Sequence, residues 1–143
     1  MVEINNLSSE IIDELFFKKI VRFILKKENK EGEISIALVK PEEIRKLNKD
    51  YRKKDSVTDV LSFANRNDII EIKDKKECFI GEIVLCPEKI RENSQEFKTD
   101  FTKELYWALI HGVLHLLGYE HKSLRDTKKM NEKEKYYLSF FNK

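Results

Sequence analysis

Cysteine is scarce in this chain of 143 residues, and long hydrophobic runs are missing. Two cysteines are too few for the disulfide framework of a small secreted domain, so we expect a reducing, cytoplasmic location. The longest stretch without Asp, Glu, Lys or Arg, residues 105–119, has 15 residues, fewer than the roughly 18–20 apolar residues that cross a bilayer. The first seventeen residues contain no Lys or Arg, unlike the basic start of a secretory signal. We therefore predict no association with a membrane.

The length and the apolar pattern predict one domain of the α+β class. A chain of this size buries about two-thirds of its unfolded surface around a single core, and residues 1–143 show no repeat or linker. Helical spacing predicts helices that begin after residues 8–10, at 41, at 87, near 102 and after 123. Extended patterns predict strands at 34–39, 57–63 and 79–86, with a polar turn at 66–77. This irregular mixture indicates an α+β fold rather than a regular βαβ repeat.

Two helix starts carry specific expectations. Ser8 and Ser9 are suitable caps for the first helix, whose apolar positions, Leu15 among them, recur at helical spacing. Ser123 is a suitable cap for the last helix, which carries Met130, Tyr137 and Phe141 on one face.

Positive charge is concentrated in one part of the chain. Residues 18–54 contain 13 Lys or Arg against 6 Asp or Glu, whereas the remainder contains 15 against 20. Such a stretch attracts phosphate groups, but a solvated helix face in a lysine-rich protein also explains it. The basic stretch therefore supports nucleic acid binding only together with other indications.

All three histidines fall within eleven residues, in the segment HGVLHLLGYEH at 111–121. On a helix, His111 and His115 lie about 40° apart around the axis and about 6 Å apart along it, so both rings can reach one ion. The surrounding segment is apolar on nearly every side, which predicts a buried central helix. Gly118 permits the left-handed turn that would bring His121 back towards the other two rings. Three nitrogen donors with an open fourth position are typical of a catalytic zinc site.

A closed structural zinc site would normally recruit a fourth Cys or His. Cys78 and Cys86 are the remaining candidates, but both are better explained as small strand residues facing the core. The same histidine spacing occurs in metzincin proteases, where a glutamate after the first histidine acts as general base. Gly112 occupies that position here and cannot accept a proton, and we expect it to provide space beside the metal.

Three segments resemble the YbeY-type endoribonucleases, which are bacterial rRNA maturation factors. LNKDYRKKDSVTDVLSF at 47–63 is similar to the family's Asn, Tyr/Phe-Arg and Thr-Asp-Val-Leu-Ser-Phe block, and IGEIVLCPEKI at 80–90 is similar to its Leu-Gly-Asp-Ile strand. Glu104-Leu105 leading into the histidine segment resembles the family signature almost letter for letter. Glu82 and Glu120 stand where the family usually has Asp, which leaves open whether either has a direct role.

The resemblance implies a zincin-like α+β domain with a mixed sheet, a buried metal-binding helix and one Zn²⁺ per chain. His111, His115 and His121 would be the ligands, and Arg52 would match the family's arginine near the metal, acting on a phosphate. The implied substrate is single-stranded RNA, with a role in rRNA maturation at the 3′ end of the small-subunit rRNA and ribosomal subunits as partners.

Other functions and mechanisms stay open at this point. The base could be a metal-activated water, Glu120, or none if the RNA 2′-hydroxyl attacks. The alternatives are a zincin-type metallopeptidase with its base outside the motif, and a non-enzymatic ribosome-associated zinc protein. A fourth protein ligand would favour the latter. The sequence does not specify an oligomeric state.

Overall fold

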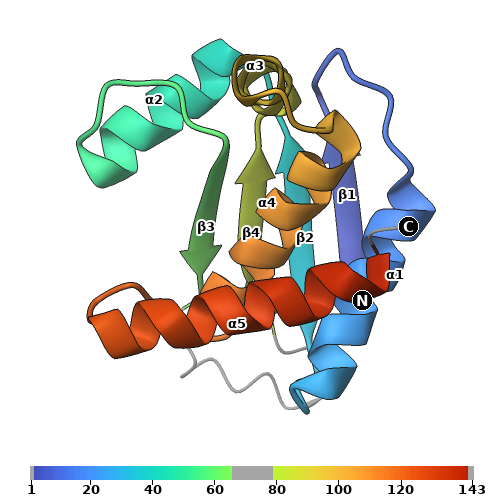
Figure 1. Ribbon diagram of the computed structural model, residues 1–143. Coiled ribbons are helices and arrows are strands. Elements are labelled where there is room, and N and C mark those ends of the chain that lie inside the picture. Colours follow the sequence, from blue (N-terminus) through green and yellow to red (C-terminus); the bar gives the residue numbers. More distant parts are fainter. Residues whose placement is uncertain (1, 66–78, 142–143) are drawn as a thin grey trace.

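The computed structural model describes residues 2–65 and 79–141 and has the α+β architecture that the sequence predicts (Figure 1). The predicted turn at 66–77 and Cys78 lie outside the described residues. The sequence patterns above do not predict the first strand, β1. The described elements are β1 (Val2–Asn6), α1 (Glu14–Lys27), β2 (Glu33–Leu38), α2 (Pro41–Arg52), β3 (Val60–Ala64), β4 (Phe79–Leu85), α3 (Pro87–Phe97), α4 (Phe101–Leu116) and α5 (Leu124–Phe141).

The strands form one mixed sheet in the order β1-β2-β4-β3. β1, β2 and β4 are parallel, and β3 is antiparallel to β4, as the opposed arrows in Figure 1 show. Helices α1 and α2 form the connections from β1 to β2 and from β2 to β3. Strand β3 is therefore an edge strand of the described sheet, and it lies against α4.

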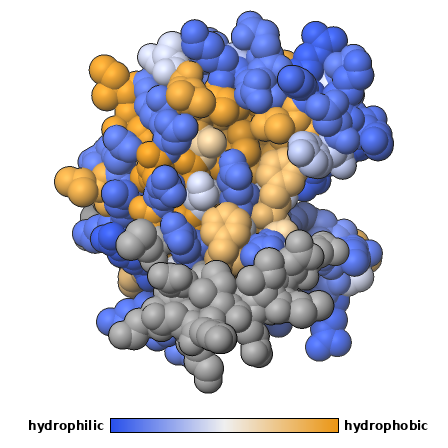
Figure 2. All heavy atoms as spheres, turned by 180° about the vertical axis from the view of Figure 1, so that it is seen from behind, coloured by the Kyte–Doolittle hydropathy of each residue, from blue (hydrophilic) through white to orange (hydrophobic). Residues whose placement is uncertain are grey.

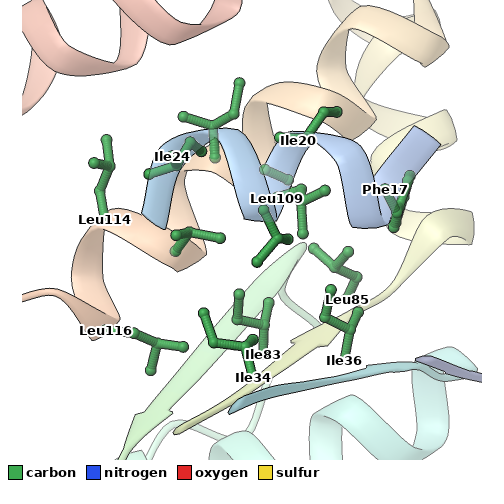
Figure 3. Packing of buried hydrophobic residues seen from close by; sticks show 14 of the residues in the cluster. Phe17, Ile20, Ile24, Ile34, Ile36, Ile83, Leu85, Leu109, Leu114 and Leu116 are labelled. Atoms are coloured by element: carbon green, nitrogen blue, oxygen red, sulfur yellow. The ribbon is translucent and has the colours of Figure 1, made fainter. Parts of the chain in front are cut away.

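The two faces of the sheet carry separate hydrophobic clusters. Alternate side chains of a strand point to opposite faces, so Ile83 and Leu85 join one cluster while Val84 joins the other. The larger cluster unites the sheet with α1, α4 and α5, and Figure 3 shows Leu109 and Leu116 of α4 pointing towards Ile34, Ile36 and Ile83 of the sheet. The smaller cluster places α2 on the opposite face, through Ile44.

Helix α1 begins later than the serine pattern predicts. Asp13 is its cap, because its carboxylate accepts a hydrogen bond from the backbone N–H of Phe16 at 3.1 Å. The Ser8 hydroxyl instead donates to the Asn6 side chain at 2.6 Å, within the turn after β1. Leu15 is 79% exposed, so its predicted place on the buried face is also wrong. The cap of α5 is as predicted, since the Ser123 hydroxyl accepts from the backbone N–H of Asp126.

Helix α4 is the buried central helix that the sequence predicts, with eight buried residues. Asp100 caps it by accepting from the backbone N–H of Lys103 at 3.0 Å. Gly112 faces the sheet, and a Cβ atom there would lie 2.9 Å from Cγ2 of Ile83. The expectation that Gly112 makes space beside the metal is therefore wrong. The missing side chain instead allows α4 to pack closely against β4. Among the described residues, no helix combines the length and apolar character needed to cross a membrane.

Candidate metal centre

Three imidazole rings gather at the carboxyl-terminal end of α4. One ring nitrogen from each of His111, His115 and His121 lies within 4.8 Å of the other two. The Nε2 atoms of His111 and His115 are 3.0 Å apart. The ring centroid of His121 lies 5.5 Å from that of His111 and 5.3 Å from that of His115. The structure therefore brings together all three histidines that the sequence selects.

The local backbone explains how His121 returns to the helix. His111 and His115 are one turn apart on α4, and the helix ends at Leu116. Gly118 has a φ of +102°, in the region that favours glycine, and its N–H donates to the carbonyl of His115 at 3.1 Å. The N–H of Tyr119 donates to the carbonyl of Leu114 at 3.1 Å. The turn is thus tied to the last turn of α4, and His121 follows it on the exposed side.

Glu134 of α5 holds His111 in place, a role that is not predicted from the sequence. Its Oε1 atom lies 2.7 Å from Nδ1 of His111, and Oε2 accepts from Nε1 of Trp107 at 2.8 Å. The Trp107 ring also stacks on His111, with centroids 4.9 Å apart. An ionised carboxylate only accepts, so Nδ1 of His111 carries a proton, and Nε2 is the nitrogen that the neutral ring would offer to a metal. Carboxylates commonly orient metal-binding histidines in this way.

A sequence signal for Glu134 does exist. Met130 and Tyr137 define the buried face of α5, and position 134 falls on that face, four residues after one and three before the other. Glu134 is only 5% exposed. A carboxylate on an apolar helix face requires hydrogen-bond donors or an opposite charge when it is buried. Such a residue therefore indicates a polar partner on another element.

The electrostatics favour a neutral His115 ring and an ionised Glu134 carboxylate. Burial lowers the pKa of His115 to about 4, and the neighbouring rings of His111 and His121 add to the effect. Burial alone would raise the pKa of Glu134, but its hydrogen bonds from His111 and Trp107 outweigh burial and lower it. At neutral pH, His115 is therefore a neutral imidazole with one nitrogen lone pair available to a metal. Glu134 is a charged hydrogen-bond acceptor.

A second carboxylate fastens the turn that leads to His121. Glu28, at the end of α1, accepts hydrogen bonds from the hydroxyl of Tyr119 at 2.5 Å, from the hydroxyl of Tyr137, and from Nζ of Lys133 at 3.1 Å. Burial would raise the pKa of Glu28, but these three donors lower it. Burial and the Glu28 carboxylate raise the pKa of Tyr119 to about 12, so its hydroxyl stays a donor. Glu28 therefore joins α1, the turn and α5.

The donor set fits a divalent metal ion. Zinc binds imidazole nitrogen at about 2.0–2.1 Å, which places tetrahedral donors roughly 3.4 Å from one another. The His111 and His115 nitrogens at 3.0 Å are near that spacing. Within the described residues, the group contains no fourth His, Cys, Asp or Glu donor. Cys86 is fully buried in the smaller hydrophobic cluster, directly after β4, as expected for a core residue.

Arg52 lies outside this group, at the exposed end of α2. Its positive charge contributes to the lowered pKa of His115, as the smallest of several causes, so the guanidinium is within electrostatic range of the metal centre. Lys53 then adopts a left-handed conformation with a φ of 59° and ends the helix. Asn48 holds the following turn by donating to the carbonyl of Ser56 at 3.0 Å. The two acids left open by the sequence are not part of the histidine group, and Glu120 pairs with Lys122 at 3.2 Å.

Comparison with known proteins identifies the family. The model of the family described as Endoribonuclease YbeY matches residues 3–142. The chain belongs to this family. An Endoribonuclease YbeY from Carboxydothermus hydrogenoformans is 38% identical over 143 residues, covering 97% of this chain and 96% of the relative. Another from Clostridioides difficile is 38% identical over 138 residues, covering 93% of this chain and 90% of the relative.

The fold of a solved structure agrees with this membership. The solution structure of TM1509 from Thermotoga maritima matches with a TM-score of 0.67 and 36% identity, covering 96% of this chain and 87% of that one. The YbeY match spans both ends of the chain, where the resemblance seen in the sequence is weakest. It confirms the family assignment made from the three segments.

Proposed function

We propose that this YbeY-family protein is a zinc-dependent endoribonuclease specific for single-stranded RNA. Residues 1–143 would form one zincin-like catalytic domain that acts in the cytoplasm on rRNA during maturation, at the 3′ end of the small-subunit rRNA, in contact with ribosomal subunits. The observation that carries the proposal is the histidine group on a chain that belongs to an endoribonuclease family.

His111, His115 and His121 would hold one zinc ion per chain. A zinc ion held there would supply a Lewis acid for a phosphoryl oxygen and would lower the pKa of a bound water. Glu134 holds a proton of His111 on Nδ1, so Nε2 would be the nitrogen that binds the ion. The hydrogen bond from the Tyr119 hydroxyl to Glu28 restrains the turn before His121.

Arg52 would act on the substrate rather than on the metal. Phosphodiester cleavage places negative charge on nonbridging oxygens, and a guanidinium meets that charge with two parallel donors. Within residues 2–65 and 79–141, no side chain forms a hydrogen bond or ion pair with Arg52, so its donors are available.

The packing of α4 argues against a protease of the metzincin type. Its general base would have to stand at position 112, where even a methyl group would meet Ile83 at 2.9 Å. A glutamate would be directed into the sheet, away from any substrate. A purely structural zinc site is disfavoured because the described residues add no fourth donor to the histidines.

The test is to measure zinc content and RNA cleavage on the same purified protein. We expect about one zinc per chain, cleavage of single-stranded RNA but not of unstructured peptides, loss of cleavage on chelation and recovery when zinc is returned. His115→Ala should lose zinc and activity while keeping the circular dichroism of the parent. Unchanged zinc in this variant would contradict the ligand set, and peptide cleavage by the parent would contradict the substrate.

A further inference from the structure

Tyr51 is an aromatic side chain that the fold leaves unburied. It is 68% exposed, the highest value for any tyrosine in the described ranges. Its ring is nevertheless supported, because it contacts the ring of Phe63 with centroids 5.3 Å apart at an interplanar angle of 67°. Phe63 belongs to β3 and packs on the smaller hydrophobic cluster. The ring of Tyr51 is therefore held at one edge while much of its surface faces solvent.

The surroundings of Tyr51 are basic. Residues 46–54 contain five Lys or Arg and only one acid, Asp50. The next acid, Asp55, is already paired with Arg45 at 2.8 Å. Figure 2, seen from behind, shows a hydrophilic surface at the upper right, where α2 lies. An exposed aromatic ring among lysines and arginines matches the two groups of a nucleotide, its base and its phosphate.

Tyr51 also adjoins the residue proposed to act on the substrate. It directly precedes Arg52 at the end of α2. A Cβ on Gly81 would lie 2.6 Å from both the carbonyl oxygen of Phe63 and Cδ2 of Leu116. The backbone of Phe63 therefore approaches the residue that follows His115, whereas the Phe63 ring that supports Tyr51 packs on the opposite face of the sheet. Tyr51 thus lies across the edge strand β3 from α4.

We propose that Tyr51 stacks on an unpaired base of the RNA and selects single strands. Arg52 and the lysines after it would contact the adjoining phosphates. Bases within a duplex are stacked on their neighbours and cannot lie flat on a side chain, whereas single strands offer free base faces. The proposal rests on the proposed function, because it assigns the substrate specificity of the same centre.

The test is binding rather than cleavage, so that it does not depend on the metal. The probe is a fluorescein-labelled single-stranded RNA of about ten nucleotides, titrated in the presence of a chelator. Tyr51→Ala should weaken binding about tenfold, within the range measured for loss of one base stack. Tyr51→Phe should bind like the parent, since it keeps the ring, and Tyr51→Leu should bind like Tyr51→Ala. Affinity for a duplex of the same sequence should be the same in all variants.

Tyr136→Ala is the matched control, because Tyr136 is a 45% exposed tyrosine on α5. It should leave the affinity for single strands unchanged. An RNA with one abasic position, moved along the strand, should bind the parent more weakly at one placement and should not further weaken Tyr51→Ala. Single-strand affinity of Tyr51→Ala equal to that of the parent would overturn the role of Tyr51, while RNA cleavage by the parent would still support the proposed function. Failure of the parent to bind or cleave RNA would overturn both.

Discussion

The two sides of the candidate active site are built in opposite ways. On the metal side, His111 is half-buried and fixed by Glu134 and by the stacked ring of Trp107. On the proposed substrate side, Arg52 is exposed at the end of α2 and forms no hydrogen bond or ion pair with a described residue. The first side is made by α4, α5 and the turn between them, and the second by one helix on the other face of the sheet.

The difference is consistent with what each side is proposed to bind. Metal coordination depends on donor positions to within a few tenths of an ångström, so it requires neighbours that restrict each ring. A phosphate chain is flexible and highly charged, so an exposed guanidinium can meet it without being fixed in advance. The metal side should therefore be sensitive to the loss of a single hydrogen bond, and the substrate side to the loss of charge or of the guanidinium shape.

The largest effect is expected from Glu134→Gln. The amide keeps the size of the side chain but removes the charged acceptor for His111, so zinc affinity should fall about 10–100-fold. Competition with a chromophoric chelator measures this. Glu132→Gln, an exposed acid two residues away on α5, makes the same change of charge and should leave zinc affinity unchanged. Equal zinc affinities for the two variants would show that Glu134 does not support zinc binding.

The next effect is expected from Arg52→Lys. Lysine keeps the positive charge but loses the two parallel donors, so RNA cleavage should fall tenfold or more, about 1.4 kcal/mol for each decade of rate. Zinc content should stay at the level of the parent. Arg45→Lys is the control on the same helix, because Arg45 pairs with Asp55 in an exposed ion pair of small energetic value. Full activity of Arg52→Lys would exclude the guanidinium from the mechanism.

A smaller effect is expected from Gly112→Ala, which tests the packing behind the metal side. The new methyl group would meet Ile83 at 2.9 Å, and overpacking of a core costs roughly 1–3 kcal/mol. Alanine recovers about 1 kcal/mol of helix propensity. We therefore expect the free energy of unfolding to fall by about 1 kcal/mol in denaturant titrations of the metal-free protein. A more stable variant would show that α4 can move away from β4.

The smallest effect is expected from neutralising Lys49, Lys53 and Lys54. If each contacts one phosphate, a plot of log affinity against log salt should become shallower by up to about 2. Titration of single-stranded RNA at several salt concentrations gives the slope. A variant with the same change of net charge outside the basic stretch should keep the slope of the parent; suitable positions are Lys103, Lys128 and Lys135. Equal slopes for both variants would assign the basic stretch to solvation alone.

The parts of the site that the sequence predicts are those that depend on neighbours along the chain. Helical spacing sets the relation of His111 to His115, and one glycine sets the turn before His121. The contact between His111 and Glu134 spans 23 residues and depends on how α5 packs across α4. No pattern within either helix contains that information, although the isolated acid on the buried face of α5 indicates that a partner exists.

The missed elements of the fold have similar causes. Strand β1 has only five residues, and two of them are asparagines, so its alternation is too short to stand out. Several residues near the start of α1 could cap it, and the choice of Asp13 over Ser8 reflects the engagement of Ser8 with Asn6 in three dimensions. At position 112 the sequence shows a glycine, but it does not show that this position of α4 faces Ile83 of the sheet.

The position of Glu134 in the chain has a consequence for protein synthesis. The three histidines leave the ribosome before α5 does, because α5 follows them in the sequence. While α5 is still within the exit tunnel, His111 has no carboxylate to set its proton, and Glu28 lacks two of its three donors, Lys133 and Tyr137. Folding of a nascent chain proceeds from the amino-terminal end, so the metal centre is completed late. An enzyme proposed to cut ribosomal RNA would thus acquire its active geometry only as its own synthesis on a ribosome ends.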